Sequence, residues 1–173
     1  KAKVAQLDAR NDLTTEEKEA AKADAQARAT AAKNNIDTAT TNSTVDNAKT
    51  TGVADVESVN PQASQKKTDA KNAVDEALKA KEAEIDANND LTAEEKAKAK
   101  EDAKSKADVA KQAIDNATTN DAVTQAKNAG AISVDSVTPT PVAKPAAKQA
   151  IDDALKAKND AIDANNDLTD EEK

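Results

Sequence analysis

The 173-residue chain contains no cysteine, histidine, methionine, phenylalanine, tyrosine or tryptophan. Without cysteine or histidine, it lacks the usual ligands of zinc, haem and iron–sulfur sites, and it has no thiol nucleophile, no serine–histidine dyad and no disulfide. Without aromatic side chains, it has no stacking surface for single-stranded nucleic acid. The net charge of −8 also opposes binding to phosphate backbones. We therefore expect no catalytic residues, no cofactor-binding residues, no metal ligands and no nucleic-acid partner.

Long apolar runs are missing as well. No apolar stretch approaches the ~20 residues needed to span a bilayer, and no signal peptide opens the sequence, so we expect no membrane insertion. Only 23 residues are valine, isoleucine or leucine, whereas 41 are alanine. Few large aliphatic residues with a high net charge are typical of disorder. Alanine, glutamate, lysine and glutamine are, however, strong helix formers, and glycine and proline are rare, so we predict an ordered all-α chain.

An internal repeat dominates the sequence. The motif DLTTEEK at 12–18 recurs as DLTAEEK at 90–96 and as DLTDEEK at 167–173, at spacings of 78 and 77 residues. Residues 1–61 are identical to residues 79–139 at 34 of 61 positions. This period predicts a piece of a longer tandem array. The predicted domains are a first copy truncated in its N-terminal helix (1–61), a complete second copy (62–139), and a third copy with only the first helix and the start of the second (140–173).

Apolar spacing in the complete copy predicts two long helices, at about 64–88 and about 92–117. The second opens with a capping box, in which Thr92 and Glu95 each accept from the other's backbone N–H. Thr14 with Glu17, and Thr169 with Glu172, repeat this pattern.

A short third helix is predicted at about 121–129, capped by Asn120 or Asp121 and closed by Gly130. Residues 131–138 are predicted to form an extended strap that packs Ile132, Val134 and Val137 on the two long helices; a β-strand is the alternative.

The fold class predicted for the chain is all-α, with elongated three-helix-bundle-like repeats. Each repeat has two long helices, followed by one short helix plus the strap. Because three legs of similar length run up, down and up, the chain should enter and leave each copy at opposite ends. Successive copies would then stack end to end as a rod in which each copy contacts only its neighbours.

Several segments superficially resemble functional sites. Residues 86–90 resemble the start of a calcium loop, but Leu91 and Ala97 replace the required glycine and glutamate, so we interpret the segment as a helix end followed by a helix start. The adjacent carboxylates Glu94 and Glu95 could do acid–base work only in a pocket that shifts a pKa, which a slender charged helix does not predict.

Two further segments allow a functional and a structural interpretation. A lysine-rich run is interleaved with acidic residues and is better interpreted as a solvated face than as an anion site; its members are Lys96, Lys98, Lys100, Lys104 and Lys106. The proline-rich stretch 138–145 could be a polyproline ligand, but a stiff spacer between copies is the simpler interpretation.

Four motifs follow one another in the first two copies: D-L-T-x-E-E-K, I-D-x-A-T-T-N, V-x-x-A-K-x-x-G and S-V-x-P. In this order and with this period they resemble the helical repeat of unknown function in Gram-positive cell-wall-anchored surface adhesins, which include staphylococcal surface proteins and giant matrix-binding proteins. The resemblance covers essentially all of the chain. It implies an extracellular, cell-wall-attached fibrous protein in which such repeats form a stalk that carries an adhesive head.

Our leading hypothesis is therefore a structural spacer that projects a binding domain away from the cell wall, as a monomer whose partners are the neighbouring repeats of the same chain. The alternative is a weak multivalent module that binds a host matrix protein or like arrays on other cells, as in biofilm formation. Residues typical of interface hot spots are scarce, since arginine occurs only as Arg10 and Arg28. An enzyme is the third and most distant hypothesis.

Overall fold

A computed structural model describes residues 2–172, so Lys1 and Lys173, the outer limits of the predicted copies, lie outside the described residues. Within this range the chain forms seven α-helices and no strand, which confirms the predicted all-α fold class and removes the β-strand alternative for 131–138. The helices are α1 (Ala2–Asp8), α2 (Thr15–Asp37), α3 (Asn42–Glu57), α4 (Gln65–Ala87), α5 (Ala93–Asn116), α6 (Asn120–Asp135) and α7 (Ala143–Asp163).

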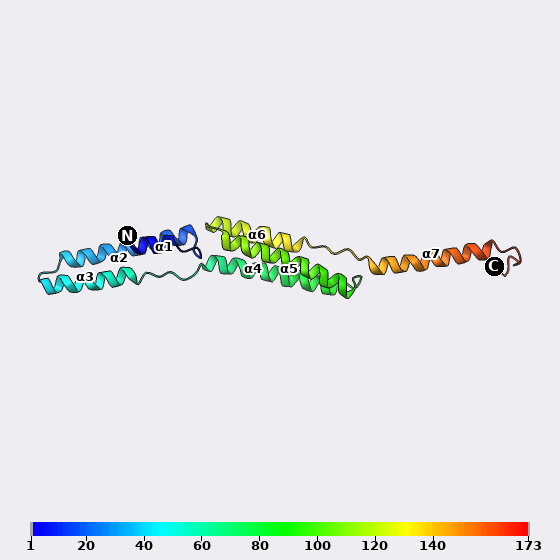
Figure 1. The fold of residues 1–173 in the computed structure, drawn as a ribbon, viewed down its shortest axis with the longest axis horizontal. Helices are drawn as coiled ribbons and strands as arrows, with labels where there is room; N and C mark the ends of the chain where they lie inside the picture. The colour runs from blue at the N-terminus through cyan, green and yellow to red at the C-terminus, as the bar shows by residue number, and fades with distance from the viewer. Residues whose placement is uncertain (1, 173) are drawn as a thin grey trace.

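The complete copy is a three-helix bundle of α4, α5 and α6, which all pack against one another and run up, down and up (Figure 1). Its helix starts are set by local hydrogen bonds. The predicted capping box opens α5, where Glu95 N donates to Thr92 Oγ1 at 3.2 Å and Thr92 N donates to Glu95 Oε2 at 2.8 Å. In α6 the cap is Thr119, one residue before the predicted Asn120 or Asp121, because its side chain accepts from Ala122 N.

The prediction of a short third helix followed by an extended strap is wrong. The helix α6 runs without interruption through Gly130 and ends only at Asp135. No described glycine has a positive φ, so Gly130 does not use the left-handed conformation with which glycine usually ends a helix. Its role is instead to let two helices approach closely.

A methyl group at Gly130 would lie 2.3 Å from Ala110 Cβ, far inside van der Waals contact. The helices α5 and α6 therefore meet backbone to side chain at this point, and only glycine fits. The first copy repeats the arrangement between α2 and α3, where a Cβ at Gly52 would lie 2.4 Å from Ala32 Cβ. This close packing offsets the cost of about 1 kcal/mol that glycine normally imposes in the interior of a helix.

Continuing α6 as a helix changes which aliphatic residues are buried. Val134 and Val137 lie 4 and 7 residues after Gly130, a helical spacing, and both are buried against the other two helices. Ile132 lies on the opposite face and is 71% exposed, which contradicts the predicted packing of this side chain on the long helices. The core of this copy combines alanine side chains of α5 with larger aliphatic side chains, among them Val74, Ile85 and Ile114.

The chain as a whole is a rod (Figure 1). The first copy consists of α1, α2 and α3, and its linker leads into α4 at the near end of the second bundle. After α6, a second linker (residues 136–142) leads away from the far end of that bundle into α7, which continues the long axis. Entry and exit thus lie at opposite ends of the complete copy, as the up-down-up arrangement predicts.

Candidate functional site: the junctions between repeats

The segment that resembles a calcium loop is a turn between α4 and α5. Asp90 N donates to Asn88 Oδ1 at 2.9 Å, which closes a local turn, and Asp167 N makes the same 2.9 Å bond to Asn165 Oδ1 in the third copy. Between residues 2 and 172, no three acidic side chains gather in a way that could hold a metal ion.

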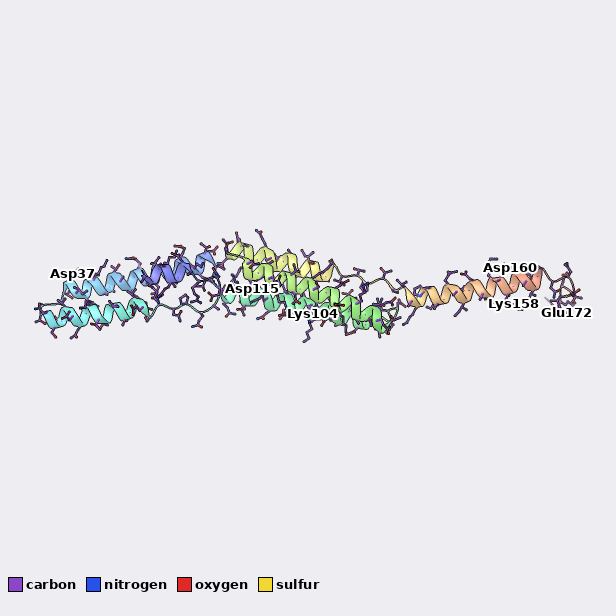
Figure 2. The ribbon with its side chains drawn as sticks, in the orientation of Figure 1. Asp37, Lys104, Asp115, Lys158, Asp160 and Glu172 are labelled. Carbon is purple, nitrogen blue, oxygen red and sulfur yellow. The ribbon has the colours of Figure 1, made fainter. Side chains whose placement is uncertain are left out.

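The lysine-rich run divides into two groups. Lys96 and Lys100 brace the turn by donating to the backbone and the side chain of Asp86, at 2.7 and 2.5 Å. Lys106 donates to Ser136 Oγ at 3.0 Å and so holds the end of α6. Lys98 and Lys104 are exposed, and Figure 2 shows Lys104 projecting away from the bundle. The run therefore includes both intramolecular braces and solvated side chains.

Of the two carboxylates considered for acid–base work, Glu95 lies at the boundary between two copies, whereas Glu94 is exposed on α5. Glu17 and Glu95 occupy equivalent positions, three residues after the cap of α2 and of α5. Each uses one oxygen to close its own capping box and the other to contact the first residues of the next copy. These glutamates thus link two copies.

Lys67 is the centre of the first junction. This side chain is only 5% exposed, and its ammonium donates to the carbonyl oxygens of Asn11 at 3.2 Å and Asp115 at 2.8 Å. Asn11 belongs to the first copy and Asp115 to the end of α5 in the second, so one lysine ties both copies together (Figure 2 labels Asp115). Hydrogen bonds to a charged donor contribute about 1.5–3 kcal/mol each, which makes this contact the strongest candidate for fixing the junction.

The start of α4 receives further support from the first copy. Ser64 caps α4 by accepting from Lys67 N, while its hydroxyl donates to Glu17 Oε1 at 2.9 Å. Ser64 N donates to the carbonyl oxygen of Asp12 at 3.2 Å. The carboxylate of Asp12 is held by Arg10 at 2.6 Å; this contact lowers the pKa of Asp12, with a smaller contribution from the Lys67 charge.

A second set of contacts joins the start of α2 to the turn between α5 and α6. Thr15 donates to the carbonyl oxygen of Thr118 through its backbone N–H at 2.7 Å and its hydroxyl at 3.0 Å. Both oxygens of Glu16 accept from Asn120 N, at 3.2 and 3.1 Å. The pKa of Glu16 is lowered by a hydrogen bond from its own backbone N–H and, second, by that from Asn120. The first copy therefore contacts both the first helix and the second turn of the next copy.

The second junction repeats the central contact of the first. Lys144 Nζ donates to the carbonyl oxygen of Asn89 at 2.6 Å, and these residues are the repeat equivalents of Lys67 and Asn11. The repeat equivalent of the capping Ser64 is Pro141, and the N-cap of α7 is Val142, so α7 has no side-chain cap of its own. Glu95 Oε1 takes over this function from the preceding copy, since it accepts from Val142 N at 2.9 Å and Ala143 N at 3.0 Å.

Hydrogen bonding favours the charged form of Glu95. The backbone N–H groups of Thr92, Ala143 and Val142 lower the pKa of this carboxyl from its usual 4.5 to about 2. Since the folded pKa is below the unfolded one, the contribution of Glu95 is complete above about pH 4.5 and is lost as the pH falls through about 2. The second junction is therefore linked to the protonation of a single carboxylate.

Sequence reasoning missed the lysines of the junction. Lys67 and Lys144 recur 77 residues apart, each directly before the apolar stripe of a first helix, and this recurrence was the available signal.

The predicted proline-rich spacer is partly correct: residues 138–142 form the linker, whereas Pro145 lies in the first turn of α7, where proline is tolerated. None of the helices within residues 2–172 is long and apolar enough to cross a membrane.

Comparison with known proteins gives results that agree with these features. Over 172 residues, or 99% of its length, the chain is 35% identical to the Extracellular matrix-binding protein ebh of Staphylococcus aureus (strain MW2), and it spans about 2% of the length of that protein. No solved structure matches. A family described as Domain of Unknown Function (DUF1542) matches three consecutive segments, residues 1–64, 66–142 and 143–173. The chain therefore belongs to the DUF1542 family of repeats.

Proposed function

We propose that this chain is a structural spacer of a bacterial cell-surface adhesin, whose tandem copies project a binding domain away from the cell wall. The observation that supports it most is the recurrence of one contact at both junctions. Lys67 and Lys144 each fix the first helix of a copy to the turn of the copy before it. A repeated, directional contact of this kind propagates one geometry along an array, as a stalk requires.

The dimensions support the same proposal. Three long helices, α2, α4 and α7, have 23, 23 and 21 residues and succeed one another along the axis of the rod (Figure 1). At ~1.5 Å per residue these three helices together exceed about 100 Å. A compact chain of this size would have a radius of gyration of only ~16 Å. The rod is thus much longer than a compact fold with the same number of residues. This shape suits a spacer better than a catalytic domain.

The proposal includes three finer points. The copies are taken as residues 1–61, 62–139 and 140–173, with the two linkers at their boundaries. The protein is placed outside the cell and attached to the wall, because the relative is named as an extracellular matrix-binding protein. It is taken as non-enzymatic, because Glu95 is engaged in capping and in the second junction, and Glu94 is exposed on a helix surface.

Small-angle X-ray scattering on the 173-residue chain tests the spacer. The expected result is a maximum dimension above about 100 Å with the pair-distance profile of a rod. A matched pair of variants tests the junction: Lys67→Met should broaden the distribution of lengths, whereas Lys66→Met, at an exposed neighbouring position, should not. A compact particle, or equal behaviour of the two variants, would contradict the proposal.

A weak multivalent binding module is the second candidate, and two observations favour it. The relative is named as a matrix-binding protein. In addition, a groove lies under the linker in both copies, with a volume of about 410 Å³ beside Val137 and about 540 Å³ beside Val59. Saturable binding of the chain to an immobilised matrix protein at physiological salt supports this candidate. If the groove is the binding site, the variant Asp102→Lys, whose substitution lies in the groove beside Val137, should lose this binding.

A further inference from the structure

The two linkers between copies differ in composition from the rest of the chain. Charged residues make up 34% of the sequence, so two linkers of this length, 58–64 and 136–142, would carry about five of them at the average composition. They carry none, and they contain no aromatic residue and no leucine. Burial accounts for this only at Val59, Ser64 and Val137, because most other linker positions are exposed. The accessible linkers are thus free of charged and large side chains.

This composition decides which endopeptidases can act on the linkers. Exposed segments without secondary structure are where folded proteins are cut. The side chain before the cleaved bond enters the S1 pocket, which suits a basic residue in trypsin, a large apolar one in chymotrypsin and a small one in elastase. Of the 23 basic residues between 2 and 172, 22 lie within helices. The exception, Arg10, lies in a turn and is held by Asp12.

Turns within the copies are too tight to be substrates. The turns at 38–41 and 117–119 have only four and three residues, and backbone hydrogen bonds fold them, such as the bond from Ala39 N to Ile36 O at 3.1 Å. Endopeptidases bind a substrate as an extended strand that pairs through its backbone. The linkers between copies are therefore the better candidates.

Proline and burial protect most linker bonds. The bonds that precede Pro61, Pro139 and Pro141 have no N–H, and the fixed φ of proline restricts their geometry, which makes them poor substrates. Val59 and Val137 are 5% and 7% exposed, so neither side chain can enter an S1 pocket. Two exposed small aliphatic residues remain, one in each linker.

In the first linker this residue is Ala63, and the bond after it is protected. Ser64 is only 3% exposed, and its N–H donates to the carbonyl oxygen of Asp12 at 3.2 Å. The chain also bends at Ala63. The first linker therefore offers an endopeptidase neither an extended strand nor an accessible bond.

In the second linker this residue is Val142, which is 63% exposed. Residues 137–142 contain no turn or bend, and Figure 1 shows them running freely between α6 and α7. Neither Thr138 N nor Thr140 N donates a hydrogen bond among the described residues, so both can pair with an enzyme. Glu95 Oε1 holds the next two N–H groups, of Val142 and Ala143, and only these two bonds must open.

The accessibility of the Val142–Ala143 bond does not depend on the length of the third copy. These two residues are the repeat equivalents of Gln65 and Lys66 at the first junction. Both Gln65 and Lys66 are exposed, although a complete copy follows them. A complete third copy would therefore leave Val142 and Ala143 exposed as well.

We propose that the second linker is a processing site, at which an endopeptidase with an S1 pocket for small aliphatic side chains hydrolyses the Val142–Ala143 bond. Water adds across the amide: the C–N bond breaks, Val142 gains a carboxylate and Ala143 gains an ammonium group. Hydrolysis there separates whole copies and leaves the bundle of α4, α5 and α6 intact. The first linker, with its buried Ser64, resists the same enzyme.

Digestion of the folded chain with pancreatic elastase, followed by intact-mass spectrometry, tests the proposal. The expected result is a fragment that ends at Val142, without fragments that end at Val59 or Ala63. Cleavage of the first linker at a similar rate, or an uncut second linker, overturns the proposal.

One substitution should exchange the class of enzyme that acts. Val142→Lys should lower the initial rate of elastase hydrolysis at this bond at least about 100-fold and make the same bond a trypsin site. In the original chain the nearest basic residue, Lys144, precedes Pro145, so trypsin has no good site there. Val109→Lys is the matched control, because Val109 is 64% exposed but lies within α5, where trypsin should not cut. Equal trypsin cleavage at both positions would show that the linker does not direct cleavage.

A graft tests the site beside a complete copy. Residues 60–65 are replaced by Thr-Pro-Thr-Pro-Val, the sequence of 138–142, so that Lys66 follows the new valine. Elastase should then cut the first linker after this valine, at a rate within several-fold of that at Val142. The same graft with aspartate in place of valine is the control and should stay uncut. If the valine graft resists elastase while helix content by circular dichroism is unchanged, the proposal is overturned.

Discussion

Replacing Gly130 by alanine tests the packing that controls the third helix. By helix propensity alone, the substitution should stabilise α6 by about 1 kcal/mol. The added methyl group would, however, lie 2.3 Å from Ala110 Cβ, whereas ordinary contact begins at 3.4 Å. The helices α5 and α6 would have to separate by about 1 Å, which weakens the contacts on both sides of the interface.

The clash decides whether Gly130→Ala raises or lowers the free energy of unfolding. Overpacking costs about 1–3 kcal/mol, and Val74 Cγ2, already 3.5 Å from the same position, leaves little room for adjustment, so the upper half of this range, about 2–3 kcal/mol, applies here. After subtraction of the propensity gain, Gly130→Ala should lower the free energy of unfolding by about 1–2 kcal/mol. The corresponding fall in Tm, at roughly 4–8 °C per kcal/mol for a unit of this size, is about 5–15 °C.

Urea and thermal unfolding followed by circular dichroism measure this loss. Asn128→Ala, at an exposed position of the same helix, is the matched control and should show only the propensity gain. The double variant Gly130→Ala/Ala110→Gly removes the clashing methyl group, so the two changes should couple favourably by at least about 0.5 kcal/mol. A Gly130→Ala protein as stable as the original chain would refute the close-packing argument.

Three further predictions follow from the junctions and from the course of α6. Lys67→Met should lower the free energy of unfolding by about 2–4 kcal/mol in urea denaturation, because two carbonyl oxygens lose a charged donor, whereas Lys66→Met should be near neutral. In NMR titrations, the amide signals at the start of α7 should shift with a midpoint near pH 2 rather than 4.5, and Glu95→Gln should abolish this transition; a midpoint near 4.5 would show that the carboxylate does not cap α7. Val134→Ala should cost about 1–3 kcal/mol and Ile132→Ala less than about 0.5, and similar losses for both would support the extended strap instead of the helix.

The features predicted correctly from the sequence are those encoded within one helix. The two long helices and the capping boxes at Thr14 and Thr92 all depend on residues a few positions apart, and the structure contains each of them. The third capping pair, Thr169 with Glu172, forms its 2.8 Å backbone bond in a turn, without a described helix after it.

The errors concern features that depend on a neighbouring helix. Gly130 was interpreted as a helix end because glycine commonly has that role, and only the proximity of Ala110 reveals its actual one. Once the helix was taken to stop there, Ile132 and Val134 appeared equivalent, although a continuous helix puts them on opposite faces. The junction lysines were missed for a related reason: their acceptors are backbone carbonyls of another copy, which carry no residue-specific signal.

Glu17 and Glu95 each bond to two copies, and this has a consequence for how an array folds and how it responds to tension. Each of these carboxylates closes the capping box of its own copy and also bonds the start of the next copy's first helix, Glu17 through the capping Ser64 and Glu95 through backbone N–H groups. A copy therefore reaches full stability only when its neighbour is folded. Folding should therefore be cooperative between neighbouring copies, with nearest-neighbour coupling along the array. Under tension, the same coupling would make the loss of one copy weaken the copies next to it, so that the fibre lengthens in regular steps instead of breaking at one point.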